Sequence, residues 1–433
     1  MLQAAEKKKV ARSINDLGRR VTAADVSTQT GLPVLVVSQA LNEIAYEAAG
    51  HMAVSQGGDI VYSFSPGFAN IYLAEGLKRL AEKTFEVIFK VGLFLLKISF
   101  GVMLIFSFFI IAVTFFVLFF ADRGNTRKDQ KQAEDRFNFL SYLVFHDLFL
   151  YFKNPAPRVV YDYNTPTVRR RDKSNFLLDC FSFLFGDGDP NEGLDEKRWQ
   201  LIAKVIKQNN NVITAEQLAP YTGADPKNED AVLPVLVRFN GTPEVTESGN
   251  IVYRFPSLAV TSSTDVQYDE PAPPFLREFH WTFTELSPAA LRPIYLIGGL
   301  NFAGSWFLWL LLHSSKAPSI TALFTTLVTY GTLFLAVPLL RSFAVRILNI
   351  GIDRRNTRRS NLAKALANPD EGLKKKIAES REYRMRDKLI GQSNIVYTTE
   401  MDSCEQDEFA SLYKPGDTFD AKPEETFDAS PRE

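Results

Sequence analysis

Gly58-Asp59-Ile60-Val61-Tyr62, with Phe64 two residues later, occurs a second time in this chain as Gly249-Asn250-Ile251-Val252-Tyr253, with Phe255 two residues later. Further matches lie upstream at nearly the same offset, where Thr22-Ala23, Val26 and Thr30-Gly31 correspond to Thr214-Ala215, Leu218 and Thr222-Gly223. Because the two sets of matches are collinear, we interpret them as two copies of one duplicated domain.

The predicted order of elements is the same in both copies. Apolar residues at helical spacing predict a first helix over 3–17 in copy one and over 194–209 in copy two. Thr22 and Thr214 can cap a second helix that Gly31 and Gly223 end, and a third helix follows over 35–49 or 228–239. Two strands then complete each copy. Three helices followed by a two-stranded wing are typical of a winged helix, so the sequence predicts an α+β fold with two winged-helix domains plus transmembrane α-helices.

The third helix is the element with which many winged helices bind DNA. Here it offers Gln39, Asn42, Glu43 and Glu47 in copy one, and Glu229, Asp230 and a single Arg238 in copy two. Acidic side chains repel phosphate, and a formal net charge of -1 gives no general attraction to nucleic acid. We therefore expect protein contacts and no nucleic acid as partner. A membrane-tethered winged-helix transcription regulator is the alternative.

Long uncharged apolar runs predict membrane spans over 98–120, 293–312 and 317–340, each near the ~20 residues that cross a bilayer. The second and third runs form a predicted hairpin. The tract 85–120 is long for one crossing and short for two, and basic residues on both sides leave its orientation open. We favour a tight or re-entrant hairpin there, which would keep the N-terminal domain on the same side as the other soluble segments.

A basic motif follows the membrane runs twice, as Asp122-Arg123-Gly124-Asn125-Thr126-Arg127 and as Asp353-Arg354-Arg355-Asn356-Thr357-Arg358. The positive-inside rule places the arginines after the last run in the cytoplasm or its organellar equivalent. Anchoring of the topology explains them, and a specific lipid or partner site is the alternative. The candidate residues for membrane-surface or partner contact are Arg123, Arg127, Arg354, Arg355, Arg358 and Arg359.

These signals divide the chain into a series of predicted segments. They are winged-helix domain 1 (1–66), a helix with the first membrane segment (67–121), a basic and aromatic linker (122–193), winged-helix domain 2 (194–258), a proline-rich and aromatic linker (259–292), a transmembrane hairpin (293–340), a basic and charged helical region (341–400) and an acidic tail expected to be disordered (401–433). The tail repeats Thr418-Phe419-Asp420-Ala421 as Thr426-Phe427-Asp428-Ala429, and these two short motifs are candidates to dock a partner.

The side chains needed for catalysis or for metal binding are sparse. Cys180 and Cys404 are isolated from each other and from the four histidines, so we expect no disulfide framework, zinc site or iron–sulfur centre. The loop 186–193 lacks the glycine and glutamate positions of an EF-hand. No Ser-His-Asp arrangement or phosphate-binding glycine loop occurs. We expect no enzymatic activity, cofactor or metal, and Asn301 with a few threonines gives little support to a transporter or channel.

The run 181–191, Phe-Ser-Phe-Leu-Phe-Gly-Asp-Gly-Asp-Pro-Asn, continuing to Glu196-Lys197-Arg198-Trp199, resembles a signature of a family of cyanobacterial and plastid thylakoid membrane proteins. The segments 249–255 and 394–399 also fit this family. Its plant members are labelled iron–sulfur cluster biosynthesis proteins, and related members are linked to photosystem II assembly or function. Two isolated cysteines do not fit the first label, because a cluster needs about four ligands.

The resemblance therefore implies a non-enzymatic accessory or assembly factor of a photosynthetic membrane complex, with photosystem II as the expected partner. It also implies an integral protein of the thylakoid membrane or plasma membrane, in contact with lipid, whose soluble domains face the cytoplasm. The family supplies no functional residues to carry over to this sequence.

Overall fold

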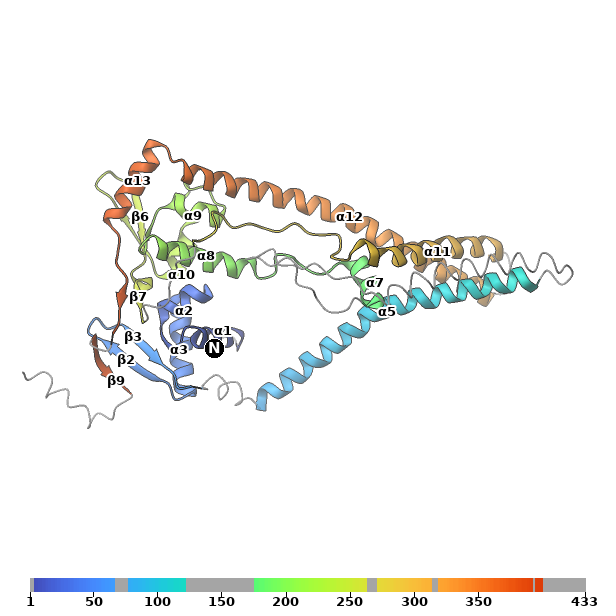
Figure 1. Ribbon diagram of the computed structural model, residues 1–433, viewed down its shortest axis with the longest axis horizontal. Coiled ribbons are helices and arrows are strands. Elements are labelled where there is room, and N and C mark those ends of the chain that lie inside the picture. The colour runs from blue at the N-terminus through green and yellow to red at the C-terminus, as the bar shows by residue number, and fades with distance from the viewer. Residues whose placement is uncertain are drawn as a thin grey trace, which may run out of the picture.

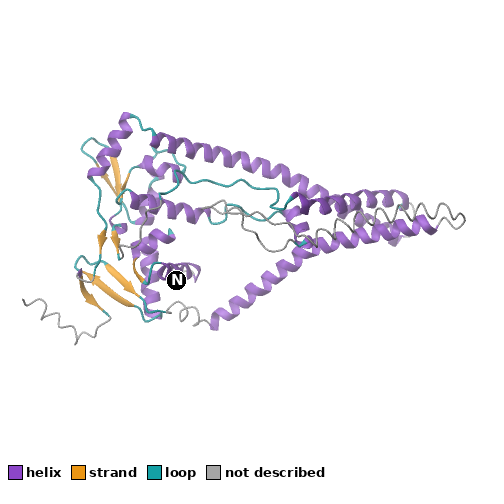
Figure 2. Cartoon of the chain, in the orientation of Figure 1, coloured by secondary structure: helices purple, strands orange, loops and turns teal. Residues whose placement is uncertain are grey.

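The computed structural model describes residues 4–66, 77–121, 175–262, 271–313, 318–391 and 394–399. A head of short helices and strands lies at one end, and long helices that converge into a bundle form the other end (Figure 1). Most strands lie on the side of the head that faces away from the bundle (Figure 2). The chain is thus a mixed helix and sheet protein whose soluble and membrane parts are separated along its long axis.

The first soluble unit contains the elements α1, β1, α2, α3, β2 and β3. They span Ala4–Asp16, Arg20–Thr22, Ala23–Thr30, Val34–Glu47, His51–Ser55 and Ile60–Ser63. Thr22 caps α2 in a capping box with Asp25, and Gly31 ends α2 at a φ of 70°, which confirms both predicted ends. The core of this unit gathers Ile14, Leu41 and Tyr62 from its helices and its central strand.

The second soluble unit repeats this order with α8, β4, α9, η1, α10, β5 and β6. They span Leu194–Gln208, Val212–Ile213, Ala215–Thr222, Glu229–Ala231, Leu233–Phe239, Thr242–Val245 and Ile251–Arg254. Thr214 is the N-cap at the start of α9 and Gly223 ends the helix, as predicted. The helix predicted over 228–239 is instead a 3-10 turn followed by the short α10, with Pro234 in its first turn. Proline suits a helix start, because its missing N–H has no partner there.

The two units pack directly against each other. α2 lies on α8, and a Cβ on Gly31 would come within 2.9 Å of Trp199 Cβ. Arg238 donates from Nε to the Gly31 carbonyl at 2.7 Å and stacks over the Trp199 ring at 4.3 Å. Asp25 accepts hydrogen bonds from the backbone and hydroxyl of Ser262, just beyond the second unit. The units therefore form one head.

A strap of the C-terminal chain, residues 383–391 and 394–399, runs across both units. It follows α13 (Glu371–Glu382) and carries β8 (Lys388–Leu389) and β9 (Ile395–Thr398). β8 pairs in parallel with β7 (Val260–Thr261), and β9 pairs antiparallel with β2, which extends the first sheet to the order β1-β3-β2-β9. The sequence analysis did not predict this strand pairing, because β9 and β2 lie more than 300 residues apart in the chain.

Three helices in the described part of the chain are long and apolar enough to cross a membrane. They are α5 (Leu77–Ala121), α11 (Pro288–Leu312) and α12 (Pro318–Ala367). α11 and α12 form the predicted hairpin, but α12 continues as one helix far beyond Leu340, so the predicted boundary at 340 and 341 falls inside it. The boundary at 292 and 293 likewise falls inside α11.

The hairpin or re-entrant turn favoured for 85–120 is wrong. α5 is one continuous helix through this tract, which contains no proline and only glycines at 92 and 101 as helix-weakening residues. An unbroken helix keeps every backbone hydrogen bond satisfied in lipid. The tract looked too long for one crossing because α5 begins outside the bundle, at Leu77 near the head, and ends at its far end (Figure 1).

Small and polar residues hold the bundle together. A Cβ on Gly298 would meet the Phe334 ring at 2.7 Å, and one on Gly304 would meet Ile111 at 2.7 Å. Asn301, which is fully buried, donates to Ser107 Oγ and links α11 to α5. Close glycine contacts and polar pairs are the usual means by which helices associate in lipid.

A short apolar helix, α7 (Phe176–Phe185), packs into the head-proximal part of this bundle. Its core contacts include Leu104 of α5, Ile294 of α11 and Phe334 of α12. The sequence analysis had placed these residues in a linker. Residues 122–174 of that predicted linker lie outside the described residues, as does the acidic tail 401–433.

Candidate functional site: the arginine faces of helix α12

An extended segment, which we call the brace (residues 276–286), lies along α12 between the bundle and the head. Its backbone is held by asparagine side chains rather than by a strand. Asn356 accepts from the Glu278 N–H at 2.9 Å and donates to the Glu278 carbonyl at 2.8 Å. Asn349 does the same for Trp281, at 2.8 and 2.9 Å. Asn349 and Asn356 are two turns apart, so they face the brace from one side of α12.

Glu278 joins the brace to two of the predicted arginines. Arg355 binds both of its carboxylate oxygens, with the closest contact from Nη2 at 2.6 Å, and Arg359 Nη1 binds Oε1 at 2.6 Å. Arg359 is buried, with 8% of its surface exposed. Burial raises the pKa of Glu278, but the hydrogen bonds and charges of the two arginines outweigh burial, so its pKa lies below the ordinary value.

The signature run after α7 fixes the other end of the brace. Asp187 accepts from Ser182 Oγ at 2.6 Å and from the Glu285 N–H at 2.8 Å. Asn191 pairs with both backbone groups of Phe279, at 2.7 and 2.8 Å. A Cβ on Gly186 would collide with the Arg341 guanidinium at 2.0 Å. The acidic and amide residues of this run therefore connect α7, the brace and α12.

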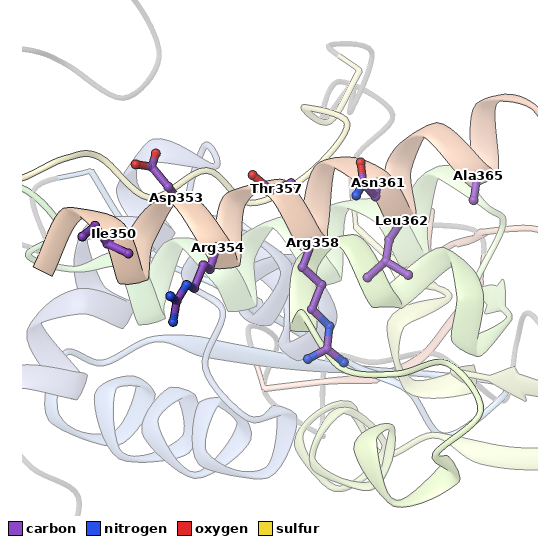
Figure 3. Close-up of a pocket in the computed structure, with 8 residues that line it drawn as sticks. All are labelled: Ile350, Asp353, Arg354, Thr357, Arg358, Asn361, Leu362 and Ala365. Atoms are coloured by element: carbon purple, nitrogen blue, oxygen red, sulfur yellow. The ribbon is translucent and has the colours of Figure 1, made fainter. Parts of the chain in front are cut away.

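The remaining arginines of the second motif lie on another face of α12. Arg354 and Arg358 are exposed and point to one side, with Asp353, Thr357 and Asn361 on the other (Figure 3). All five side chains, together with Ile350, Leu362 and Ala365, line a shallow, open groove of about 720 Å³. A second hollow of about 430 Å³ adjoins it and includes Arg346 and Phe283. Asp353 Oδ1 forms a hydrogen bond with His280 Nε2 of the brace at 2.6 Å.

The structure therefore divides the predicted arginine set. Arg355 and Arg359 hold the brace, Arg354 and Arg358 line the open groove, and Arg123 and Arg127 lie outside the described residues. Helical periodicity of about 100° per residue separates the two pairs. That periodicity, with the seven-residue spacing of Asn349 and Asn356, was the signal in the sequence that could have distinguished them. The aromatic residues Trp281 and Phe283 of the brace lie along α12, where they contact Asn349 and Arg341.

The third helices of the two soluble units show different surfaces. On α3, Lys7 binds Glu43 and Glu47, while Leu35 and Tyr46 are 69% and 91% exposed. The exposed positions of α3 between them, Gln39 and Asn42, are uncharged. On α10, Arg238 is engaged by Gly31 and Trp199, and Leu233 and Val237 are exposed.

No group of three or more His, Cys, Asp and Glu side chains that could hold a metal ion occurs in the ranges that the structure describes. Cys180 is buried in α7. The features that the structure presents are the arginine guanidinium groups of α12 and the exposed uncharged surface of α3.

No protein-family model matches the chain, and no solved structure matches it significantly. A relative is the Arabidopsis thaliana chloroplastic protein At5g03900, which is 32% identical over 426 residues, or 92% of this chain and 80% of the relative. The match extends over the head, the membrane helices and the arginine faces alike. The chain therefore belongs to the family of this chloroplastic Arabidopsis protein, a conserved family associated with plastids.

Proposed function

We propose that this chain is a non-enzymatic accessory or assembly factor of a photosynthetic membrane complex, with photosystem II as the complex, and that it acts through protein–protein contacts. Three candidate membrane spans and a chloroplastic relative support a place in a plastid membrane. The resemblance of the 181–191 signature supports the photosystem and the thylakoid membrane. The positive-inside rule supports a head on the stromal or cytoplasmic side, because Arg354 and the arginines after it lie on the head side of the spans (Figure 1).

We also propose that each soluble unit is a winged helix and that the pair arose by duplication. Both units have three helices followed by two antiparallel strands, with a first short strand before the second helix. At matching positions, the backbone N–H groups of the N-cap residues Thr22 and Thr214 donate to the side chains of Asp25 and Gln217, three residues further on. Gly58 and Gly249 adopt positive φ at the matching wing turns. Corresponding caps and turns at corresponding places support a common origin for the two units.

The observation that carries the proposed function is the exposed stripe on α3. Leu35, Gln39, Asn42 and Tyr46 follow helical spacing along one uncharged face, and the acidic side chains beside them are tied to Lys7. Tyrosine is enriched in the core of protein interfaces and among the residues that contribute most to binding. The alternative, a tethered transcription regulator, needs basic side chains on this helix, and the second unit's Arg238 is already engaged within the head.

Affinity purification tests the proposal. The tagged chain is expressed in its photosynthetic host, extracted in mild detergent and compared with a Leu35→Ser/Tyr46→Ala variant and with Val245→Ser, which alters an exposed apolar side chain on β5. We expect photosystem II subunits with the wild type and Val245→Ser, and their loss with the double variant. Recovery of DNA with no membrane complex, or equal recovery with all three proteins, contradicts the proposal.

A further inference from the structure

A single stripe of exposed side chains runs along the outer face of α12 from the bundle to the groove. Leu340, Phe343, Ile347 and Ile350 follow one another at spacings of three or four residues and are all exposed, Ile347 at 69%. Arg354 and Arg358 continue the stripe at the same spacing. The stripe therefore changes from apolar to cationic between Ile350 and Arg354.

In this segment of α12, the polar and apolar faces are reversed relative to a surface helix of a soluble protein. Arg341, Asn349 and Asn356 face inward and are bound to the brace, whereas the large apolar side chains face outward. The exposed Arg346 lies to one side of the apolar stripe, in the hollow beside Phe283. A surface helix in water carries its apolar stripe toward the protein. Apolar residues outward and polar residues inward is the pattern of a helix surrounded by lipid. Lipid contact on this face therefore extends past Arg341 as far as Ile350.

The length of the exposed apolar surface agrees with this boundary. From Ile320 to Ile350, both exposed, α12 rises roughly 45 Å. A bilayer including its headgroup regions is about 40–45 Å thick. Arg354, one turn beyond Ile350, then lies at the level of the phosphates.

Two features of the arginine pair indicate an anionic ligand. Arg354 and Arg358 are one turn apart, and like charges at this spacing repel each other. No ion pair with either guanidinium occurs in the part of the chain that the structure describes, in contrast to Arg355 and Arg359, which share Glu278. The carboxylate of Asp353 points away from the pair and is held by His280 (Figure 3).

We propose that this face of α12 is a binding site for an anionic phospholipid. Arg354 and Arg358 bind the phosphate, and the stripe from Leu340 to Ile350, about 15 Å long, packs against an acyl chain. The site does not depend on which complex the chain serves, and it fixes the depth at which the head stands above the membrane.

Native mass spectrometry of the full chain tests the site. The protein is purified in mild detergent, stripped of lipid, and titrated separately with phosphatidylglycerol and with phosphatidylcholine of the same acyl chains. We expect a preference for phosphatidylglycerol that Arg354→Gln/Arg358→Gln lowers by about fivefold for each arginine. Arg384→Gln/Arg386→Gln, which removes two exposed charges from the strap, is the matched control and keeps the preference. Glycerol phosphate without acyl chains should not compete at the same concentration.

Equal binding of the two lipids, or an unchanged preference in the Arg354→Gln/Arg358→Gln variant, overturns the proposal. Loss of a co-purifying protein with an unchanged lipid preference would assign the arginine pair to a protein partner instead. Arg354→Lys/Arg358→Lys separates charge from folding, because it retains both charges and should keep most of the preference. The lipid titrations use the isolated chain, so their failure leaves the proposed photosystem contact untouched.

Discussion

At the scale of single residues, the head depends on a glycine that lets its two units meet. Gly31 combines a positive φ with close contact to the backbone and Cβ of Trp199 in the second unit. Its carbonyl also accepts the hydrogen bond from Arg238. Gly249, at the wing turn of the second unit, has a similar φ of 78° but nothing within 4 Å of a Cβ. Comparison of Gly31 with Gly249 therefore distinguishes the cost of backbone strain from the cost of disturbing the contact between the units.

Alanine at these two positions should therefore differ in cost. Gly249→Ala should lower the free energy of unfolding by roughly 1–2 kcal/mol through its left-handed backbone alone. Gly31→Ala should cost a further 1–3 kcal/mol or so, because the added methyl overpacks the contact between the units. Thermal unfolding of the two variants in detergent compares them. Equal losses would mean that the contact at Gly31 contributes little.

Glu278 is the second residue on which the arrangement depends. Glu278→Gln leaves the buried Arg359 without a carboxylate partner, and we expect the free energy of unfolding to fall by roughly 2–4 kcal/mol. This is toward the lower end for buried ion pairs, because the other partner, Arg355, is half exposed. Glu244→Gln, which breaks a pair with Arg254 at the surface, should cost about 0–1 kcal/mol. Unfolding midpoints measured side by side check the ranking, and a larger effect at Glu244 would contradict it.

The same carboxylate predicts a pH dependence. The pKa of Glu278 is lowered in the folded state from 4.5, so its contribution to stability is complete above that value and is lost as pH falls through the lower folded pKa. The difference in unfolding midpoint between wild type and Glu278→Gln should stay constant above ~pH 5 and shrink below ~pH 4.5. A difference that grows on acidification would contradict the assignment.

At the scale of elements, the first sheet is completed by β9, a strand from the C-terminal part of the chain. β9 carries Ile395-Val396-Tyr397, the triplet that forms the central strands β3 and β6 of the two units. It covers the outer edge of β2. The corresponding edge strand β5 has Pro243, which cannot donate a hydrogen bond to a further strand. Pro243 therefore makes the edge of β5 less suited to a further strand than the edge of β2.

Truncation tests the role of β9. A chain ending at Gly391 should expose the edge of β2, and hydrogen exchange in His51–Ser55 should accelerate, since the backbone hydrogen bonds to β9 contribute about 1 kcal/mol each. A chain ending at Thr399 keeps β9 and serves as the control. Equal exchange in the two truncated chains would show that β9 does not protect the edge.

Local signals made several elements predictable from sequence. Thr22, Thr214, Gly31 and Gly223 mark helix ends through their own side chains or backbone freedom, and the structure has these ends where they were expected. Long apolar runs likewise predicted the membrane helices. The contacts of Asp187, Glu278 and β9 were not predictable, because each depends on a partner about 80 to 350 residues away in the chain. Such pairings leave no mark within one short window of sequence.

At the scale of the whole molecule, both soluble units lie at the same end of the membrane helices. α5 leaves the first unit and runs to the far end of the bundle, while α12 returns from that end to the second unit (Figure 1). The prediction that the N-terminal domain shares a side with the second domain agrees with this packing, although the hairpin from which it was argued does not exist. We therefore expect one head on one side of the membrane.

Cysteine labelling in oriented membrane vesicles tests that claim most directly. In a Cys404→Ser background, Gln39→Cys reports on the first unit, Glu247→Cys on the second and His313→Cys on the far end of α11; all three positions are exposed. A membrane-impermeant maleimide should label Gln39→Cys and Glu247→Cys from the same face, and His313→Cys only from the opposite face. Labelling of Gln39→Cys and Glu247→Cys from opposite faces would contradict a single head.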